Sequence, residues 1–174
     1  MRAYVGYLID LIKDYLPTDD KVVGAEVGVW EGKASRSMLF HLPMLTLYMV
    51  DLWEELQSNP SLVVTKEMAE EAHKKAISAT EFAGSRRLIL FASSEKASQQ
   101  IPDHALDFVF IDADHMYPSI YADLRLWFPK VRPGGLMIGH DYEQRWGVKQ
   151  AVDEYAKEGK YDLTTHNRVW WFLK

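Results

Sequence analysis

The feature that most constrains this chain is an apolar strand pattern followed at once by a cluster of polar side chains. Residues 106–111 read Leu-Asp-Phe-Val-Phe-Ile, a continuous apolar run typical of a central parallel strand that is buried on both faces. Asp112, Asp114, His115 and Tyr117 follow directly. In open α/β sheets, ligands bind just beyond the carboxyl ends of the strands. The polar residues are therefore expected to form a functional site, although a solvated loop that caps the next helix would give the same pattern.

The rest of the chain alternates strand patterns with helical patterns. A pair of short strand patterns, 161–166 and 169–173, flanks Asn167-Arg168 and predicts a closing antiparallel hairpin. This alternation predicts an α/β fold, a Rossmann-like doubly wound sheet that is mostly parallel with an antiparallel C-terminal hairpin strand. Residues 52–60 are expected to be an irregular loop. The other strands are expected at 22–27, 45–50, 88–91, 106–111 and 136–138.

Length and composition limit the classes to which the protein can belong. The 174 residues fit one domain, expected to span 1–174 and to begin with an amphipathic helix at about 1–16. The absence of Cys excludes disulfides, thiolate metal sites and Cys nucleophiles. A formal net charge of -5 argues against a nucleic-acid partner. Charged residues interrupt the N-terminal segment, which therefore predicts neither a secretory signal nor a membrane span, and a cytoplasmic location is expected.

A glycine pattern follows the first strand. In Glu26-x-Gly28-x-x-x-Gly32 the glycines would let the backbone approach a ligand, and the next helix would offer free N–H groups to a carboxylate. Tight packing of the strand against that helix would explain the same glycines. The pattern is not Gly-x-Gly-x-x-Gly, so the dinucleotide-binding fingerprint is not met.

Polar residues also follow the second and third strands. Asp51 stands where an acid accepts hydrogen bonds from ribose hydroxyls in nucleoside-binding units, with a helix cap or a solvated loop acid as the alternative. Ser93 and Ser94 would cap the next helix and could also border an adenine ring. Together these positions predict recognition of a nucleoside along one edge of the sheet.

Taken together, the motifs resemble those of class I S-adenosylmethionine-dependent methyltransferases, from about Val22 to the C-terminus. A small branch of that family reads Ile-Asp-x-x-His-x-Tyr after the fourth strand and a Gly with His-Asp-Tyr after the fifth, and this chain has both, at 111–117 and 139–142. The other residues that carry the resemblance are Ala25-Glu26-Val27-Gly28 with Gly32, Asp51, and Arg132-Pro133-Gly134-Gly135.

The resemblance implies S-adenosylmethionine as the cofactor. Glu26 and Gly28 would line its methionine part, Asp51 its ribose, and Ser94 with its neighbours its adenine. The full set of residues expected to bind the cofactor is Glu26, Gly28, Gly32, Asp51, Leu52, Ser93, Ser94 and Asp112.

A divalent metal is left open by the sequence. Catechol-type O-methyltransferases, a related group, bind Mg²⁺ through an acid after the fourth strand and an Asp-Asn pair after the fifth. The corresponding residues here are Asp112, His140 and Asp141. The His-Asp pair departs from that pattern, because imidazole is a poorer Mg²⁺ ligand than oxygen.

Catalysis would also require removal of a proton from the acceptor. His115 is the first candidate for the general base and His140 the second, because an unperturbed imidazole titrates near neutral pH. His140 with Asp141 could form a base and its orienting partner. Either histidine could instead be hydrogen-bonded in a loop without a catalytic role.

The resulting hypothesis is methyl transfer from S-adenosylmethionine, with O-methylation of a small organic or sugar acceptor. The expected partner is a small molecule, with no nucleic acid and no membrane, and a homo-oligomer is left open. The alternative is a non-catalytic nucleoside-binding domain that acts as a regulatory subunit, which would not need the histidines and aspartates at the strand ends. A nicotinamide-dependent reductase is disfavoured by the missing dinucleotide fingerprint.

Overall fold

A computed structural model of the chain describes residues 3–16, 20–59, 62–143 and 147–174. The main sheet consists of β1 (Val22–Val27), β2 (Leu45–Asp51), β5 (Arg87–Phe91), β6 (Leu106–Ile111), β7 (Val131–Gly139), β8 (Thr164–His166) and β9 (Val169–Leu173). The helices are α1 (Ala3–Tyr15), α2 (Lys33–His41), α3 (Lys66–Thr80), α4 (Ser94–Ser98), α5 (Tyr117–Trp127) and α6 (Val148–Gly159), with short 3₁₀ segments η1 (Glu81–Arg86) and η2 (Phe128–Lys130).

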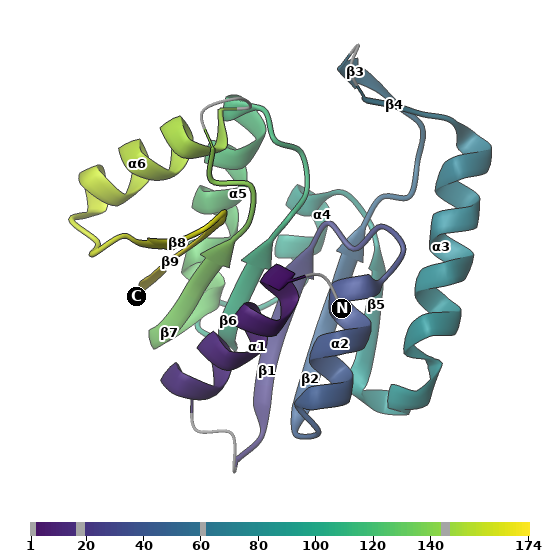
Figure 1. The fold of residues 1–174 in the computed structure, drawn as a ribbon, viewed down its shortest axis with the longest axis horizontal. Coiled ribbons are helices and arrows are strands. Elements are labelled where there is room, and N and C mark those ends of the chain that lie inside the picture. Colours follow the sequence, from purple (N-terminus) through teal and green to yellow (C-terminus); the bar gives the residue numbers. More distant parts are fainter. Residues whose placement is uncertain (1–2, 17–19, 60–61, 144–146) are drawn as a thin grey trace.

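The strand order is β5-β2-β1-β6-β7-β9-β8 (Figure 1). Neighbours from β5 to β7 pair in parallel, whereas β9 pairs antiparallel with both β7 and β8. The doubly wound sheet with an antiparallel C-terminal hairpin, predicted from the sequence, is thereby confirmed.

Helices cover both faces of the sheet, and a core lies under each layer. Buried residues of α1, α2 and α3 belong to one apolar cluster, and buried residues of α4, α5 and α6 belong to the other. The central strand β6 contributes residues to both clusters: Phe108 and Phe110 lie in the first, and Val109 and Ile111 lie in the second. The continuous apolar run of this strand therefore reflects burial on its two faces.

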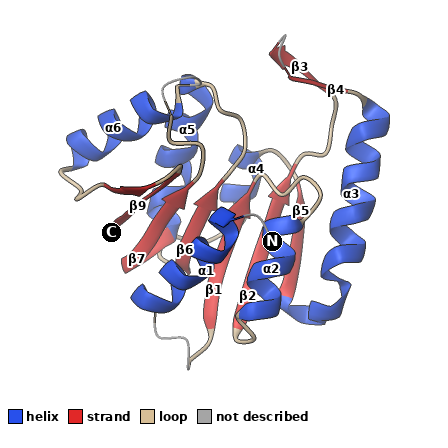
Figure 2. Ribbon diagram, in the orientation of Figure 1, coloured by secondary structure: helices blue, strands red, loops and turns tan. Residues whose placement is uncertain are grey.

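Three segments differ from the sequence-based expectation. The first strand of the C-terminal hairpin, predicted at 161–166, is limited to Thr164–His166. The region predicted as an irregular loop, 52–60, contains β3 (Leu56–Asn59), which pairs antiparallel with β4 (Leu62–Val64) in a small sheet apart from the main one (Figure 2). Its first strand is largely polar and gives no clear alternating signal. The strand predicted at 136–138 begins earlier, at Val131, because a register shift against β6 accommodates the proline and glycines before the apolar run.

The register of the parallel strands places the C-terminal ends of β1, β2, β6 and β7 at the same level of the sheet. Val27 of β1 pairs with Val50 of β2 and with Ile111 of β6, and Ile111 in turn pairs with Gly139 of β7. The residues that follow these four positions therefore emerge side by side at one edge of the sheet. Among the described helices, none combines the length and the hydrophobicity that a transmembrane span requires.

Candidate functional site

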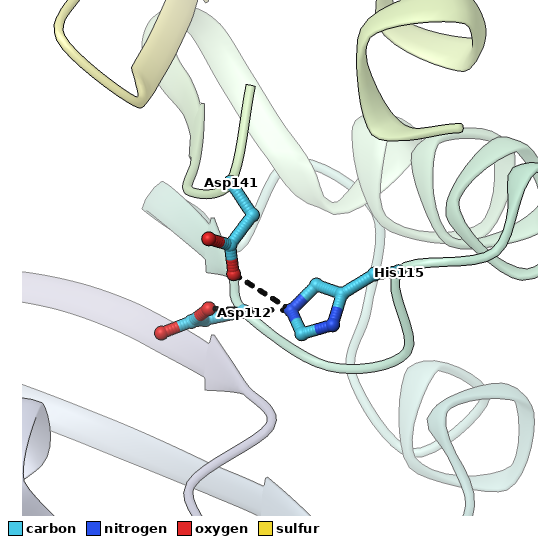
Figure 3. Close-up of side chains that lie close together, drawn as sticks. All are labelled: Asp112, His115 and Asp141. Atoms are coloured by element: carbon cyan, nitrogen blue, oxygen red, sulfur yellow. Dashed lines mark ion pairs between the residues drawn. The ribbon is translucent and has the colours of Figure 1, made fainter. Parts of the chain in front are cut away.

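Two carboxylates and an imidazole converge where β6 and β7 end (Figure 3). His115 Nε2 lies 2.8 Å from Asp141 Oδ2 and 4.0 Å from Asp112 Oδ1. One potential ligand atom from each of the three residues lies within 4.8 Å of the others. These residues, Asp112, His115 and Asp141, form what is called here the Asp–His–Asp cluster.

The charges within this cluster are strongly coupled. The neighbouring carboxylates of Asp112 and Asp141 raise the pKa of His115 to about 9. Burial acts to raise the pKa of Asp141, but hydrogen bonds from His115 and His140 outweigh it and hold this pKa well below the usual range. At neutral pH His115 is therefore an imidazolium, which cannot accept a proton until it has lost its own.

The backbone of Asp141 is turned so that its side chain enters the cluster. Its φ of 58° lies in the left-handed region, which Asp tolerates better than most residues do, and only 8% of the residue is exposed. Arg168, at the turn between β8 and β9, pairs with the same carboxylate and with Glu143. Sequence reasoning treated Arg168 only as a turn residue, because nothing local indicates that the hairpin reaches this edge of the sheet.

His140 stands beside the cluster. Its Nδ1 lies 3.3 Å from Asp141 Oδ1 and 3.8 Å from Asp112 Oδ1, and its ring stacks on Tyr4 of α1. The metal set predicted from the sequence contains Asp112, His140 and Asp141, whereas the set whose ligand atoms all lie within 4.8 Å of one another contains His115 instead. Two carboxylates with one imidazole form a donor set that fits a divalent cation.

Glu26 lies at the end of β1, with only 2% of the residue exposed. Its carboxylate accepts a hydrogen bond from Ser35 Oγ of α2. Burial raises the pKa of Glu26 well above its ordinary value; the nearby carboxylates of Asp112 and Asp51 raise it further, and the Ser35 bond opposes them. Asp112 and Asp51, which the sequence predicted to share one site with Glu26, thus lie close enough to act on the pKa of Glu26. A cationic ligand group would relieve their repulsion.

Asp51 organises the loop that follows β1. Its Oδ2 accepts hydrogen bonds from the backbone N–H groups of Val29 (2.9 Å) and Trp30 (2.7 Å), and its Oδ1 accepts one from Trp53 N–H (2.8 Å). Trp30 and Trp53 both have positive φ. Leu52 is 40% exposed beside them. A contact between Asp51 and a ribose stays a prediction. The hydrogen bonds by which Asp51 fixes the loop between β1 and α2 are seen in the structure.

The two glycines of that loop are required by packing. A Cβ added to Gly28, whose φ is 92°, would lie 2.3 Å from the carbonyl oxygen of Asp112. A Cβ on Gly32, whose φ is 73°, would lie 2.9 Å from Cα of Ala76 in α3. Close packing therefore accounts for both positions, but against the backbone that follows β6 and against α3, not between β1 and the next helix as the sequence-based alternative had it. Gly28 also brings the loop after β1 against the backbone of Asp112, a member of the Asp–His–Asp cluster.

The serines after β5 have separate roles. Ser93 Oγ accepts a hydrogen bond from Lys96 N–H and caps α4, as the sequence allowed. Ser94 Oγ instead donates to the carboxylate of Asp123 in α5 and accepts from Trp127 Nε1 at 2.8 Å. Sequence reasoning missed Asp123, because its helical position alone gives no sign of burial. Burial raises its pKa to about 6.

Asp123→Asn is expected to change how the stability of the fold depends on pH. The folded-state pKa of Asp123 is about 6, above its ordinary value of 3.8. Asp123 therefore makes its full contribution to the free energy of unfolding below about pH 3.8, where it is protonated in both the folded and the unfolded state. This contribution is lost as the pH rises through about 6. Above that pH the variant should be more stable than the wild type by about 1–3 kcal/mol, because Asn carries no charge to bury.

Urea unfolding of both proteins from about pH 4 to about pH 8 measures this difference. Asp103→Asn is the control, because the Asp103 carboxylate is exposed and paired with Lys130. Stability curves of wild type and Asp123→Asn that run parallel across the whole range would contradict the expectation.

The chain matches known proteins over its central part. Residues 25–142, more than half of the chain, match the family model described as "Methyltransferase domain". Uncharacterized proteins of Sinorhizobium fredii and of Acanthamoeba polyphaga mimivirus are each 34% identical over 64 residues, which cover 35% and 33% of this chain. The aligned stretch covers only 7% and 29% of those two proteins, so it spans less than a third of either.

Solved structures extend the similarity to nearly the whole chain. The O-methyltransferase NovP has a TM-score of 0.74 at 19% identity, with 98% of this chain and 79% of that chain covered. The calicheamicin methyltransferase CalS11 has a TM-score of 0.68 at 12% identity, with 96% and 77% covered. An O-methyltransferase from Bacillus cereus in complex with SAH has a TM-score of 0.65 at 16% identity, with 100% and 82% covered. The chain therefore belongs to the methyltransferase-domain family, with the Rossmann-like fold of the class I S-adenosylmethionine-dependent methyltransferases predicted from its sequence.

Proposed function

We propose that this protein transfers the methyl group of S-adenosylmethionine to a hydroxyl oxygen of a small organic or sugar acceptor. The observation that carries the proposal is the Asp–His–Asp cluster, which lies at the same sheet edge as Glu26 and the loop held by Asp51. The likeness in fold to two proteins described as O-methyltransferases supports oxygen as the atom that receives the methyl group.

The reaction is an in-line displacement at the methyl carbon. A lone pair of the acceptor oxygen forms the new C–O bond while the C–S bond breaks, and its electrons return to sulfur. The positive sulfonium thereby becomes a neutral sulfide, and the acceptor loses its proton. Alignment of oxygen and methyl group can contribute up to roughly 7–11 kcal/mol. Removal of the proton by a positioned base adds on the order of 10²–10⁴ in rate.

The two histidines have different parts in this proposal. His115 lies between two carboxylates that keep it protonated, so it serves as a counter-charge or, once deprotonated, as a ligand. Its Nε2, with carboxylate oxygens of Asp112 and Asp141, would hold a divalent cation. When bound, such a cation lowers the pKa of a coordinated hydroxyl group. His140, with Nδ1 3.3 Å from Asp141 Oδ1, is then the imidazole that accepts the proton. This reverses the order of the two bases expected from the sequence.

His140→Gln is expected to lower kcat by about 10²–10⁴-fold and to leave the affinity for S-adenosylmethionine within about twofold. The measurement is transfer of a labelled methyl group to a panel of phenols, catechols and sugars, with and without EDTA and with Mg²⁺ or Mn²⁺ restored. His104→Gln is the control, because His104 contacts the backbone of Val131 at the start of β7.

Calorimetry with S-adenosylmethionine distinguishes the proposal from its alternatives. A protein that does not bind this cofactor would contradict the proposal outright. A protein that binds the cofactor yet methylates no acceptor would favour the non-catalytic nucleoside-binding domain. Turnover that survives in His140→Gln would leave methyl transfer in place and exclude His140 as the base.

A further inference from the structure

The N-terminal helix α1 contacts the Asp–His–Asp cluster and His140, called together the reaction centre, although it is distant from them in the sequence. The phenol of Tyr4 donates a hydrogen bond of 3.1 Å to Asp112 Oδ2, across 108 positions of the chain. The ring of Tyr4 also stacks on His140, with centroids 3.9 Å apart and planes inclined by 27°. One side chain of α1 therefore contacts both strand-end motifs, the one after β6 and the one after β7.

This helix is held firmly enough to position a side chain. Tyr7, one turn after Tyr4, stacks on His166 of β8 with centroids 4.4 Å apart. The helix thus contacts the C-terminal hairpin as well as the site, and it lies on the same face of the sheet as α2 (Figure 1). Five aliphatic residues of the helix are buried in the core: Val5, Leu8, Ile9, Leu11 and Ile12.

We propose that Tyr4 is a positioning residue of the reaction centre, an inference that rests on the proposed function. The phenol engages Oδ2 of Asp112 and so directs Oδ1 toward His115 and His140, which lie 4.0 and 3.8 Å away. The stacked ring fixes the plane of His140. Nδ1 of His140 is thereby kept 3.3 Å from Oδ1 of Asp141. Small losses of alignment in such a centre reduce rates strongly.

Two substitutions separate the hydroxyl from the ring. Tyr4→Phe keeps the stack and removes the hydrogen bond; it should lower kcat about tenfold, the effect of losing one hydrogen bond to a charged group. Tyr4→Leu removes both contacts and should lower kcat about a hundredfold. KM for S-adenosylmethionine and the melting temperature of Tyr4→Phe should match those of the wild type. Tyr7→Phe and Tyr7→Leu are matched controls on the same helix and should keep kcat within about twofold.

A spectroscopic readout tests the same contact without turnover. The aromatic ring over His140 shifts the NMR signals of the imidazole, which His140→Gln identifies by their disappearance. Tyr4→Leu should move the His140 signals and leave those of His166 in place, and Tyr7→Leu should do the reverse. Unmoved His140 signals in Tyr4→Leu, or equal kcat in the Tyr4 and Tyr7 variants, would overturn the inference. A wild-type protein without methyl transfer would contradict the proposed function, while the spectra would still decide whether Tyr4 positions His140.

Discussion

Replacement of Asp141 by asparagine is expected to lower kcat by about 10³-fold while the affinity for S-adenosylmethionine changes by no more than about twofold. Asparagine has nearly the same shape and tolerates the left-handed backbone that this position adopts, with φ of 58°. The substitution therefore leaves the turn intact. It removes the negative charge that pairs with His115 at 2.8 Å and also with His140 and Arg168.

A change in the protonation of His115 should accompany the loss of activity. Asp141 is one of the two carboxylates that raise the pKa of this imidazole to about 9, so in Asp141→Asn the pKa should fall back toward its ordinary value. NMR titration of the imidazole in the presence of EDTA measures this shift, and initial rates with calorimetry measure the kinetic effect. Unchanged turnover in the variant would exclude Asp141 from the reaction centre.

Asp107→Asn is the matched control for this experiment. Asp107 is also a paired aspartate, but it binds Arg132 and the backbone N–H of Val23. It lies on β6, near the end of the strand opposite to the site. We expect this control to cost about 1 kcal/mol of unfolding free energy and to retain turnover, because it removes a structural hydrogen bond and no reacting group.

Glu26→Gln should have effects of opposite sign on binding and on stability. If Glu26 receives the ammonium group of the methionine part, loss of its charge should weaken the binding of S-adenosylmethionine by about 10²-fold. The same change should make the unliganded fold more stable near neutral pH, because an almost fully buried carboxylate no longer has to be ionised. Gln keeps an oxygen that accepts the hydrogen bond from Ser35.

The pH range of the stability effect follows from the raised pKa of Glu26. The contribution of this group to stability is complete below its ordinary value of 4.5 and is lost as the pH rises through the higher folded-state value. Glu26→Gln should therefore gain stability over the wild type on the alkaline side only. Calorimetric titration and urea unfolding at about pH 5 and about pH 8 measure the two effects.

Glu31→Gln provides the control within the same loop. Glu31 pairs with Lys33 and Lys75 at the surface, and this pairing lowers its pKa. Little change is expected in either cofactor affinity or stability, since exposed ion pairs contribute little. A fall of both quantities together in Glu26→Gln would mean that Glu26 has only a structural role.

Local pattern in the sequence determined the elements of the fold and the edge at which the site lies. The apolar run at 106–111 indicated a strand buried on both faces, and the structure buries alternate residues in two separate cores. Glu26, Asp51 and Asp112 were expected together because parallel strands end at one edge, and the carboxylates of Asp51 and Asp112 do raise the pKa of Glu26. Such features repeat every two or every 3.6 residues, so a single segment carries enough information to predict them.

Only the tertiary structure decided which side chains meet across elements. Arg168 reaches Asp141 across 27 positions, Ser94 reaches Asp123 across 29, and Tyr4 reaches Asp112 across 108. The close approach of Gly28 to the backbone of Asp112, and the proximity of His115 to both Asp112 and Asp141, arise in the same way. These contacts depend on the order and register of the strands and on the face of the sheet that each helix covers. Strand order, register and helix placement are properties of the assembled sheet, so no single segment of the sequence specifies them.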